Sequence, residues 1–134
     1  AAAVAKELGI KRALPLATAG AFHSKFMQPA REKLAPVLDG ITFNAPKIPV
    51  LSNVTGKPHD NDPAAIKALM LEQVTGTTNW AADVEAAKAL GCGMFVEFGP
   101  GKVLCGLIKK IDAALTTVNV SDLASLDATL AALG

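Results

Sequence analysis

Extended segments alternate with helical segments along most of this sequence, and that alternation constrains the fold more than any other feature. Residues 94–98 and 116–120 have the composition of strands, and the residues between them repeat apolar side chains at helical spacing. Helical segments of about 10–15 residues placed between strands are typical of α/β domains. The sequence therefore predicts the α/β class.

Capping residues mark several helix boundaries. Asp62 followed by Pro63 begins one predicted helix, which Gly76 ends, and Asn79 begins the next. Ser121 is expected to begin the last helix. The residues predicted to face inward from the last two helices are Val103, Leu104, Leu107, Ile108, Ile111, Leu123, Leu126, Leu130 and Leu133.

The first half of the sequence gives weaker signals. A helix end is predicted at residues 2–8, and a helix at residues 24–38 whose two prolines predict a late start, a kink or an early end. Strands or short extended segments are predicted at residues 12–18, 41–44 and 48–54. The sequence opens in the middle of a helical pattern, so we expect a truncated start.

The composition excludes several classes of protein. Hydrophobic residues make up 51% and the mean hydropathy is +0.35, which predicts a packed core rather than disorder. No apolar run approaches the roughly 20 residues that cross a bilayer, and no signal peptide is expected. A net charge of +1 and 4% aromatic residues do not favour nucleic-acid binding.

The cysteines predict neither a disulfide framework nor a metal site. Cys92 and Cys105 have apolar neighbours, so both are expected to be buried thiols in a reducing compartment. Together with His23 and His59 they do not show the spacing of zinc ligands, and we expect no metal. His59 stands in a polar segment and is predicted to lie at the surface.

His23 is the candidate for chemistry. It follows a predicted strand and precedes a predicted helix, where α/β folds place reactive groups. A histidine can accept and return a proton near neutral pH, which suits a general base. The alternative from the residues alone is an exposed histidine at a helix start.

Four segments in the same order resemble the malonyl-CoA:acyl carrier protein transacylases and the acyltransferase domains of fatty acid and polyketide synthases. The first is Gly-Ala-Phe-His-Ser-Lys-Phe-Met at residues 20–27. The others are residues 41–46 with 49–54, Gln73 with Asn79 and Trp80, and residues 96–104. The match covers nearly the whole chain but only the last part of the family's length.

The resemblance implies a fold and an activity. The fold would be the C-terminal part of an α/β-hydrolase-like domain (residues 20–134) with the end of a ferredoxin-like subdomain (residues 1–19). The activity would be transfer of malonyl from malonyl-CoA to acyl carrier protein in fatty acid biosynthesis, without a cofactor. The expected compartment is the cytoplasm, with an organelle such as the plastid as the alternative.

The resemblance also implies roles for three residues. His23 would activate a serine on a Gly-x-Ser-x-Gly elbow and then protonate the departing thiolate. The backbone carbonyl of Gln73 would orient His23. The alternative is that Gln73 is a solvent-exposed residue at a helix end without a functional role. Phe22 would leave no room for a methylmalonyl branch, or else it only packs in the core.

The nucleophile and the carboxylate clamp are absent from this sequence. The serines are Ser24, Ser52, Ser121 and Ser125, and none lies in an elbow context. Neither Arg12 nor Arg31 matches the family's arginine that binds the malonyl carboxylate. We therefore expect this chain alone to be inactive and to need the missing N-terminal portion as a partner. Lysines that would help dock an acidic carrier protein are Lys25, Lys33, Lys57 and Lys102.

Two other functions remain as alternatives. One is a non-catalytic fragment or interaction module of the α/β class. The other is a nucleotide site at residues 99–102, Gly-Pro-Gly-Lys, although the longer glycine spacing of a phosphate loop is lacking. Glu97 stands among apolar strand residues and is expected to be paired in the core, with no partner evident from the sequence.

Overall fold

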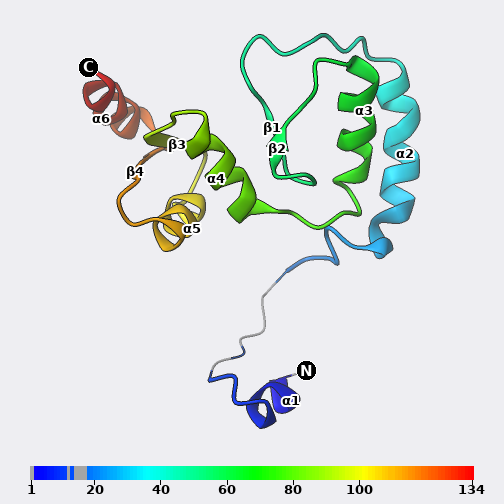
Figure 1. The fold of residues 1–134 in the computed structure, drawn as a ribbon, viewed down its shortest axis with the longest axis horizontal. Coiled ribbons are helices and arrows are strands. Elements are labelled where there is room, and N and C mark those ends of the chain that lie inside the picture. The colour runs from blue at the N-terminus through cyan, green and yellow to red at the C-terminus, as the bar shows by residue number, and fades with distance from the viewer. Residues whose placement is uncertain (1, 12, 14–17) are drawn as a thin grey trace.

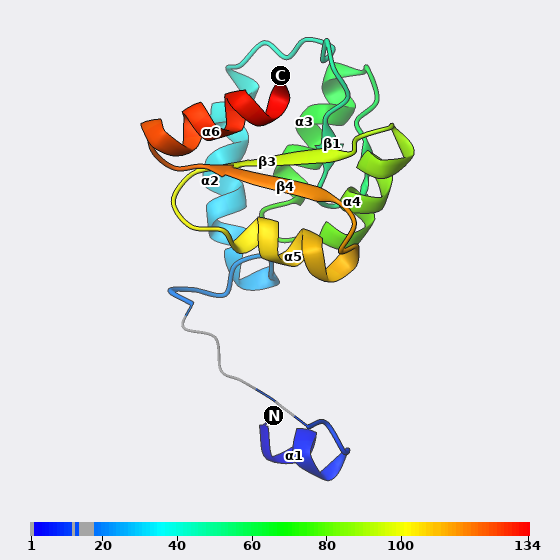
Figure 2. The same cartoon turned by 90° about the vertical axis from the view of Figure 1, so that its left-hand side faces the viewer.

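The computed structural model describes residues 2–11, 13 and 18–134 (Figure 1). The helices are α1 (Ala2–Glu7), the 3-10 helix η1 (Lys25–Met27), α2 (Gln28–Asp39), α3 (Pro63–Glu72), α4 (Trp80–Ala89), α5 (Val103–Ile111) and α6 (Leu123–Leu133). The strands are β1 (Leu51–Ser52), β2 (Lys57–Pro58), β3 (Met94–Phe98) and β4 (Thr116–Val120). α1 stands apart from the other elements in both views (Figures 1 and 2).

A strand–helix–strand unit forms the C-terminal half. β3 and β4 pair in parallel, from Met94 opposite Thr116 to Phe98 opposite Val120, and α5 connects them. Figure 2 shows the two strands side by side, with α5 below and α6 above them. A parallel pair needs such a crossover because its strands run in the same direction. The predicted α/β class is confirmed.

The described core lies where α4, α5 and the start of β4 meet. Val84 is 1% exposed, and it packs with the buried Ile108 and Leu115. Trp80, Phe95 and Ile111 cover this cluster. Burial of apolar surface of this kind is the main force that holds such elements together.

The other half consists of a helix pair and a hairpin. α2 and α3 lie side by side, and β1 pairs with β2 in antiparallel fashion next to α3 (Figure 1). Lys67 of α3 forms an ion pair with Asp39 at the end of α2. Gly56, with φ of +65°, makes the hairpin turn, and a side chain there would collide with Ala82 of α4. The turn therefore sets how closely the hairpin approaches α4.

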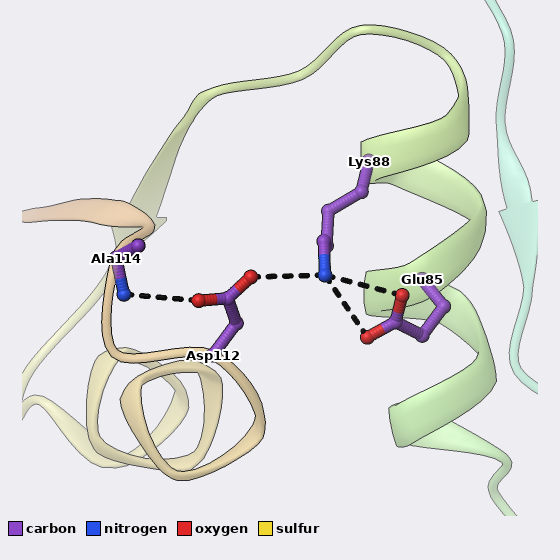
Figure 3. Close-up of polar contacts among 4 residues, drawn as sticks. All are labelled: Glu85, Lys88, Asp112 and Ala114. Atoms are coloured by element: carbon purple, nitrogen blue, oxygen red, sulfur yellow. Dashed lines mark hydrogen bonds and ion pairs between the residues drawn. The ribbon is translucent and has the colours of Figure 1, made fainter.

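A charged network joins α4 to the end of α5 (Figure 3). The Lys88 Nζ atom lies 2.9 Å from Asp112 and 3.2 Å from Glu85. Asp112 also accepts the N–H of Ala114 at 2.9 Å. These contacts raise the pKa of Lys88, chiefly through its hydrogen bond to Asp112, and the same bond lowers the pKa of Asp112.

Prolines divide the helix predicted over residues 24–38. The segment forms η1 and then α2, with Pro29 in the first turn of α2 and Pro36 inside it. Pro29 is tolerated there because a first-turn residue has no intrahelical N–H partner to lose. The late start that the prolines predicted is what the structure shows.

The prediction for the last helix was wrong in two respects. Asp122, not Ser121, is the N-cap, because its carboxylate accepts the Ser125 N–H and the Ser125 hydroxyl accepts the Asp122 N–H. Thr129 is the buried residue of α6, at 4% exposed. The leucines that were expected to face inward are exposed at Leu123, Leu130 and Leu133, by 79%, 56% and 59%.

Other expectations also need correction. The extended segment predicted at residues 48–54 contains the strand Leu51–Ser52, whereas residues 41–44 contain none. The strand predicted at residues 12–18 falls largely on residues outside the described ranges. Val103 is 69% exposed although it was placed on the buried face of α5. Cys105 is buried as predicted, whereas Cys92 is exposed because it follows the end of α4.

None of the described helices is long and apolar enough to cross a membrane.

Candidate active site

His23 is held in a tight turn before η1. Its backbone has a φ of +56°. Among the described residues other than glycine, His23 is the one with a positive φ. The Ser24 side chain donates to the Ala21 carbonyl at 2.6 Å and accepts the Phe26 N–H at 3.3 Å. Left-handed backbone at a residue with a side chain is uncommon and costs about 1–3 kcal/mol, so surrounding contacts must enforce it. The Ser24 bonds supply such contacts.

The main-chain oxygen of Gln73 lies at the imidazole ring. His23 Nδ1 is 2.9 Å from the Gln73 carbonyl oxygen, although the two residues are 50 positions apart in the sequence. Gln73 is the C-cap of α3. The last carbonyls of a helix have no intrahelical N–H partner, so this oxygen is free to accept a bond from a side chain. The end of α3 thereby provides the contact that the resemblance implied.

This contact determines the proton distribution on the ring. A carbonyl oxygen only accepts hydrogen bonds, so Nδ1 must carry the proton when the bond is formed. In the neutral ring Nε2 is then the unprotonated nitrogen. Because His23 is exposed, Nε2 is available to a group that approaches from solvent. The arrangement suits a general base that works through Nε2.

A second contact fixes the segment that carries this carbonyl. Arg31 of α2 donates to the Thr75 hydroxyl at 3.4 Å, and Thr75 in turn donates to the Glu72 carbonyl at 3.4 Å. This arginine thus ties α2 to the residues that follow α3. The sequence showed only that Arg31 does not match a substrate clamp, and nothing in it indicated this contact.

A cavity of about 290 Å³ lies beside Gln73. It is bounded by the hairpin segment and α3, and His59 lines it together with Ser52 and Asn53. His59 was predicted to be a surface residue, but it is half-buried, and its Nδ1 is covered without a hydrogen-bond partner in the described structure. His59 is covered because it lines the cavity that the hairpin segment shares with α3.

Phe22 does not pack in the described core. Phe22 is 59% exposed, and its ring lies next to Gly20. Within the described part of this chain, Phe22 is therefore not a core residue. The four lysines named for carrier docking, Lys25, Lys33, Lys57 and Lys102, are all exposed.

Glu97 has partners that the sequence did not reveal. Its carboxylate accepts the N–H of Leu104 at 3.1 Å and of Cys105 at 2.8 Å, both in the first turn of α5. These bonds, that from Cys105 most strongly, lower the pKa of Glu97. A bound phosphate would need the same N–H groups. The nucleotide alternative at residues 99–102 is therefore disfavoured.

Glycine is required in the turn after β3 for a conformational reason. Gly99 and Gly101 have φ of +123° and +94°, which side-chain-bearing residues rarely adopt. The Gly-Pro-Gly turn thus has a structural explanation. Among the residues that the structure describes, no group of three or more His, Cys, Asp or Glu side chains is placed to hold a metal ion.

Comparison with known proteins bears directly on these features. No protein-family model matches the sequence. The chain is 43% identical over 122 residues to a malonyl CoA-acyl carrier protein transacylase of Bacillus subtilis, a match that covers 91% of this chain and 38% of that protein. An acyl-carrier-protein S-malonyltransferase structure from Burkholderia pseudomallei superposes with a TM-score of 0.86 at 43% identity, over 97% of this chain and 42% of that one.

A further solved structure holds a malonyl-transacylase in complex with a type II PKS acyl-carrier protein. It matches with a TM-score of 0.88 and 40% identity, over 98% of this chain and 42% of that chain. The fold and the matches together show that the proteins this chain is similar to belong to the class of acyltransferases. More particularly, it is homologous to a segment of the malonyl CoA-acyl carrier protein transacylase family, as the resemblance predicted. The chain spans about two fifths of the length of these relatives, from 38% to 42%.

Proposed function

We propose that this chain is the histidine-bearing part of an enzyme that moves malonyl from malonyl-CoA to the phosphopantetheine thiol of acyl carrier protein. The homology supports the substrates, because the relatives are transacylases of that kind. The observation that carries the proposal is the 2.9 Å contact between His23 Nδ1 and the Gln73 carbonyl oxygen. It fixes the tautomer and leaves Nε2 as the base.

The reaction runs in two half-steps. A serine hydroxyl gives its proton to His23 Nε2 and attacks the malonyl thioester carbonyl, and the thiolate of coenzyme A leaves with the proton from the imidazolium. The pantetheine thiol then gives its proton to Nε2 and attacks the malonyl-serine ester. The serine oxygen leaves and recovers that proton. Gln73 accepts from Nδ1 throughout and so holds the ring in place.

The serine and the arginine of this mechanism lie outside these 134 residues. The sequence holds no Gly-x-Ser-x-Gly segment, and neither of its arginines matches the clamp. On this proposal the chain is inactive by itself and completes a site with the N-terminal portion of the enzyme.

Residues 20–134 belong to the large α/β-hydrolase-like domain and residues 1–19 to the ferredoxin-like subdomain. The reaction serves fatty acid biosynthesis in the cytoplasm, or in a plastid.

Steady-state kinetics test the proposal. In an enzyme that joins this chain to its serine-bearing portion, the initial rate is measured while malonyl-CoA is varied at several carrier concentrations. We expect parallel lines in the double-reciprocal plot, because a covalent intermediate separates the two substrates. Mass spectrometry without carrier should show a malonyl adduct on the serine. Intersecting lines with no adduct would contradict the covalent mechanism.

Phe22 is expected to set the preference for the unbranched substrate. In the complete enzyme, Phe22→Ser should raise the methylmalonyl-CoA to malonyl-CoA ratio of kcat/KM by about 10–100-fold, since a methyl group changes discrimination by about 1–3 kcal/mol. Phe26→Ser is the matched control, because Phe26 is also exposed, at 73%. We expect its ratio to stay within about twofold of the parent. Equal ratios for the parent and the Phe22 variant would refute the steric account.

A further inference from the structure

Two contacts join the segment that carries His23 to the segment that carries Gln73. His23 Nδ1 lies 2.9 Å from the Gln73 carbonyl oxygen, and Arg31 Nη1 lies 3.4 Å from the Thr75 hydroxyl oxygen. Arg31 stands in the first turn of α2, and Thr75 lies in the turn that follows α3. Figure 1 shows α2 and α3 side by side and running in opposite directions, so the start of α2 lies beside the end of α3. The two segments are therefore held together at two points near the candidate base.

The turn after α3 is built around one carbonyl group. The Glu72 oxygen accepts the N–H of Gly76 at 2.8 Å, the N–H of Thr75 at 3.1 Å and the Thr75 hydroxyl at 3.4 Å. These donors close the end of the helix and leave the next carbonyl, that of Gln73, to accept from His23. A side chain at Gly76 would come within 3.0 Å of the Glu72 oxygen. The position of the Gln73 carbonyl therefore depends on the geometry of a tight turn.

Arg31 sets the direction of the hydroxyl group in this turn. A threonine hydroxyl has one proton and two lone pairs, so it can donate to one group while it accepts from another. The guanidinium of Arg31 carries only donors and is not deprotonated in proteins. The Thr75 oxygen therefore accepts from Arg31, and its proton is directed to the Glu72 carbonyl. Arg31 and Thr75 are both half-buried, which limits competition from water.

Other contacts hold the surrounding segments at different places. The Asn79 N–H donates to the Asn53 carbonyl at 2.7 Å, which ties the residues after the turn to the hairpin. The ion pair of Lys67 with Asp39 also joins α3 to α2, but it lies at the last residue of α2. The contact of Arg31 lies at the opposite end of α2, the end that η1 connects to His23. Arg31 is thus the tie nearest to the base.

We propose that Arg31 is a positioning residue for His23, because through the Thr75 hydroxyl it fixes the turn that presents the Gln73 carbonyl to Nδ1. The proposal rests on the proposed function, which makes His23 the base. Arg31 keeps Nδ1 protonated and Nε2 unprotonated by holding the acceptor in place, and it contacts no reacting atom. Both bonds in this relay are long, at 3.4 Å, so its loss should cost less than the loss of the base itself.

Kinetics of the complete enzyme test the relay. Arg31→Met should lower kcat for malonyl transfer by about five- to twentyfold and leave KM for malonyl-CoA within about twofold, because Arg31 positions the base and does not bind substrate. Thr75→Val removes the hydroxyl and should have the same effect, whereas Thr75→Ser keeps the hydroxyl and should restore kcat. Lys47→Met, at an exposed lysine, is the control for loss of a positive charge and should behave like the parent.

A second background distinguishes positioning from a merely structural role. In the His23→Ala enzyme, Arg31→Met should change the residual transfer by less than about twofold, because Arg31 acts through the imidazole that is already gone. An equal loss with and without His23 would mean that Arg31 only supports the fold, and the proposal would fail. Thr75→Val provides the same comparison if Arg31→Met does not fold.

Nitrogen-15 NMR gives a readout that does not depend on transfer. The His23 signals of the complete enzyme are assigned by their absence from the His23→Ala enzyme. Arg31→Met and Thr75→Val should each raise the fraction of neutral rings protonated at Nε2 by about twofold or more, and Lys47→Met should leave it unchanged. The parent fraction in both folded variants would overturn the inference.

The outcomes separate this inference from the proposed function. A changed tautomer in variants of an enzyme that transfers no malonyl would support the positioning and defeat the proposed function. An unchanged tautomer in variants of an enzyme that does transfer malonyl would defeat the positioning alone.

Discussion

We expect the replacement of His23 with alanine to lower malonyl transfer by the complete enzyme by about three to four orders of magnitude, a loss of about 4–5.5 kcal/mol of transition-state stabilisation. The reason is that no other described group stands where Nε2 does, bonded through Nδ1 to the Gln73 carbonyl at 2.9 Å. The measurement is kcat/KM for transfer of labelled malonyl from malonyl-CoA to holo acyl carrier protein. Circular dichroism of the variant establishes that it is folded.

The control for this prediction follows from the atom that Gln73 supplies. Gln73→Ala keeps the backbone carbonyl, so transfer should stay within about tenfold of the parent. A His23→Ala enzyme that retains near-normal transfer would defeat the assignment of the base. A Gln73→Ala enzyme as impaired as His23→Ala would show that the side chain, rather than the carbonyl, is what matters.

We expect the replacement of Ile108 with alanine to destabilise the 134-residue chain by about 2–4 kcal/mol, because truncation of a buried isoleucine removes its burial and leaves a cavity. Ile108 is 3% exposed and packs against Val84 and Leu115 in the cluster that joins α4, α5 and the start of β4. Urea unfolding followed by circular dichroism gives the change in free energy of unfolding.

Leu123→Ala provides the comparison for Ile108. Leu123 is 79% exposed, so its truncation should change the free energy of unfolding by less than about 0.5 kcal/mol. Equal losses at the two positions would mean that this cluster is not the core of the chain.

The C-terminal half was the part of the fold that the sequence predicted best. β3, α5 and β4 begin and end close to the predicted residues because local signals agree there, with apolar spacing and a Gly-Pro-Gly turn between them. The last helix shows the limit of that reasoning. Its leucines repeat at helical spacing, but the face that meets β4 carries Thr129, so spacing alone chose the wrong side.

The candidate site depended on different kinds of information. The position of His23 after a predicted strand drew attention to it, but its contact with Gln73 spans 50 residues and came only from the resemblance. Asp83 and Glu97 could not be interpreted from the sequence, because their environments are created by packing between distant elements. Glu97 meets the start of α5, and Asp83 faces a hollow between two strands.

The tautomer of His23 is the most direct test of the central claim. Nitrogen-15 NMR of the neutral ring in the chain distinguishes a protonated Nδ1 from a protonated Nε2. The account predicts a protonated Nδ1, bonded to the Gln73 carbonyl, and an unprotonated Nε2. A neutral ring protonated mainly at Nε2 would contradict it, because that ring could neither donate to Gln73 nor accept a proton from serine.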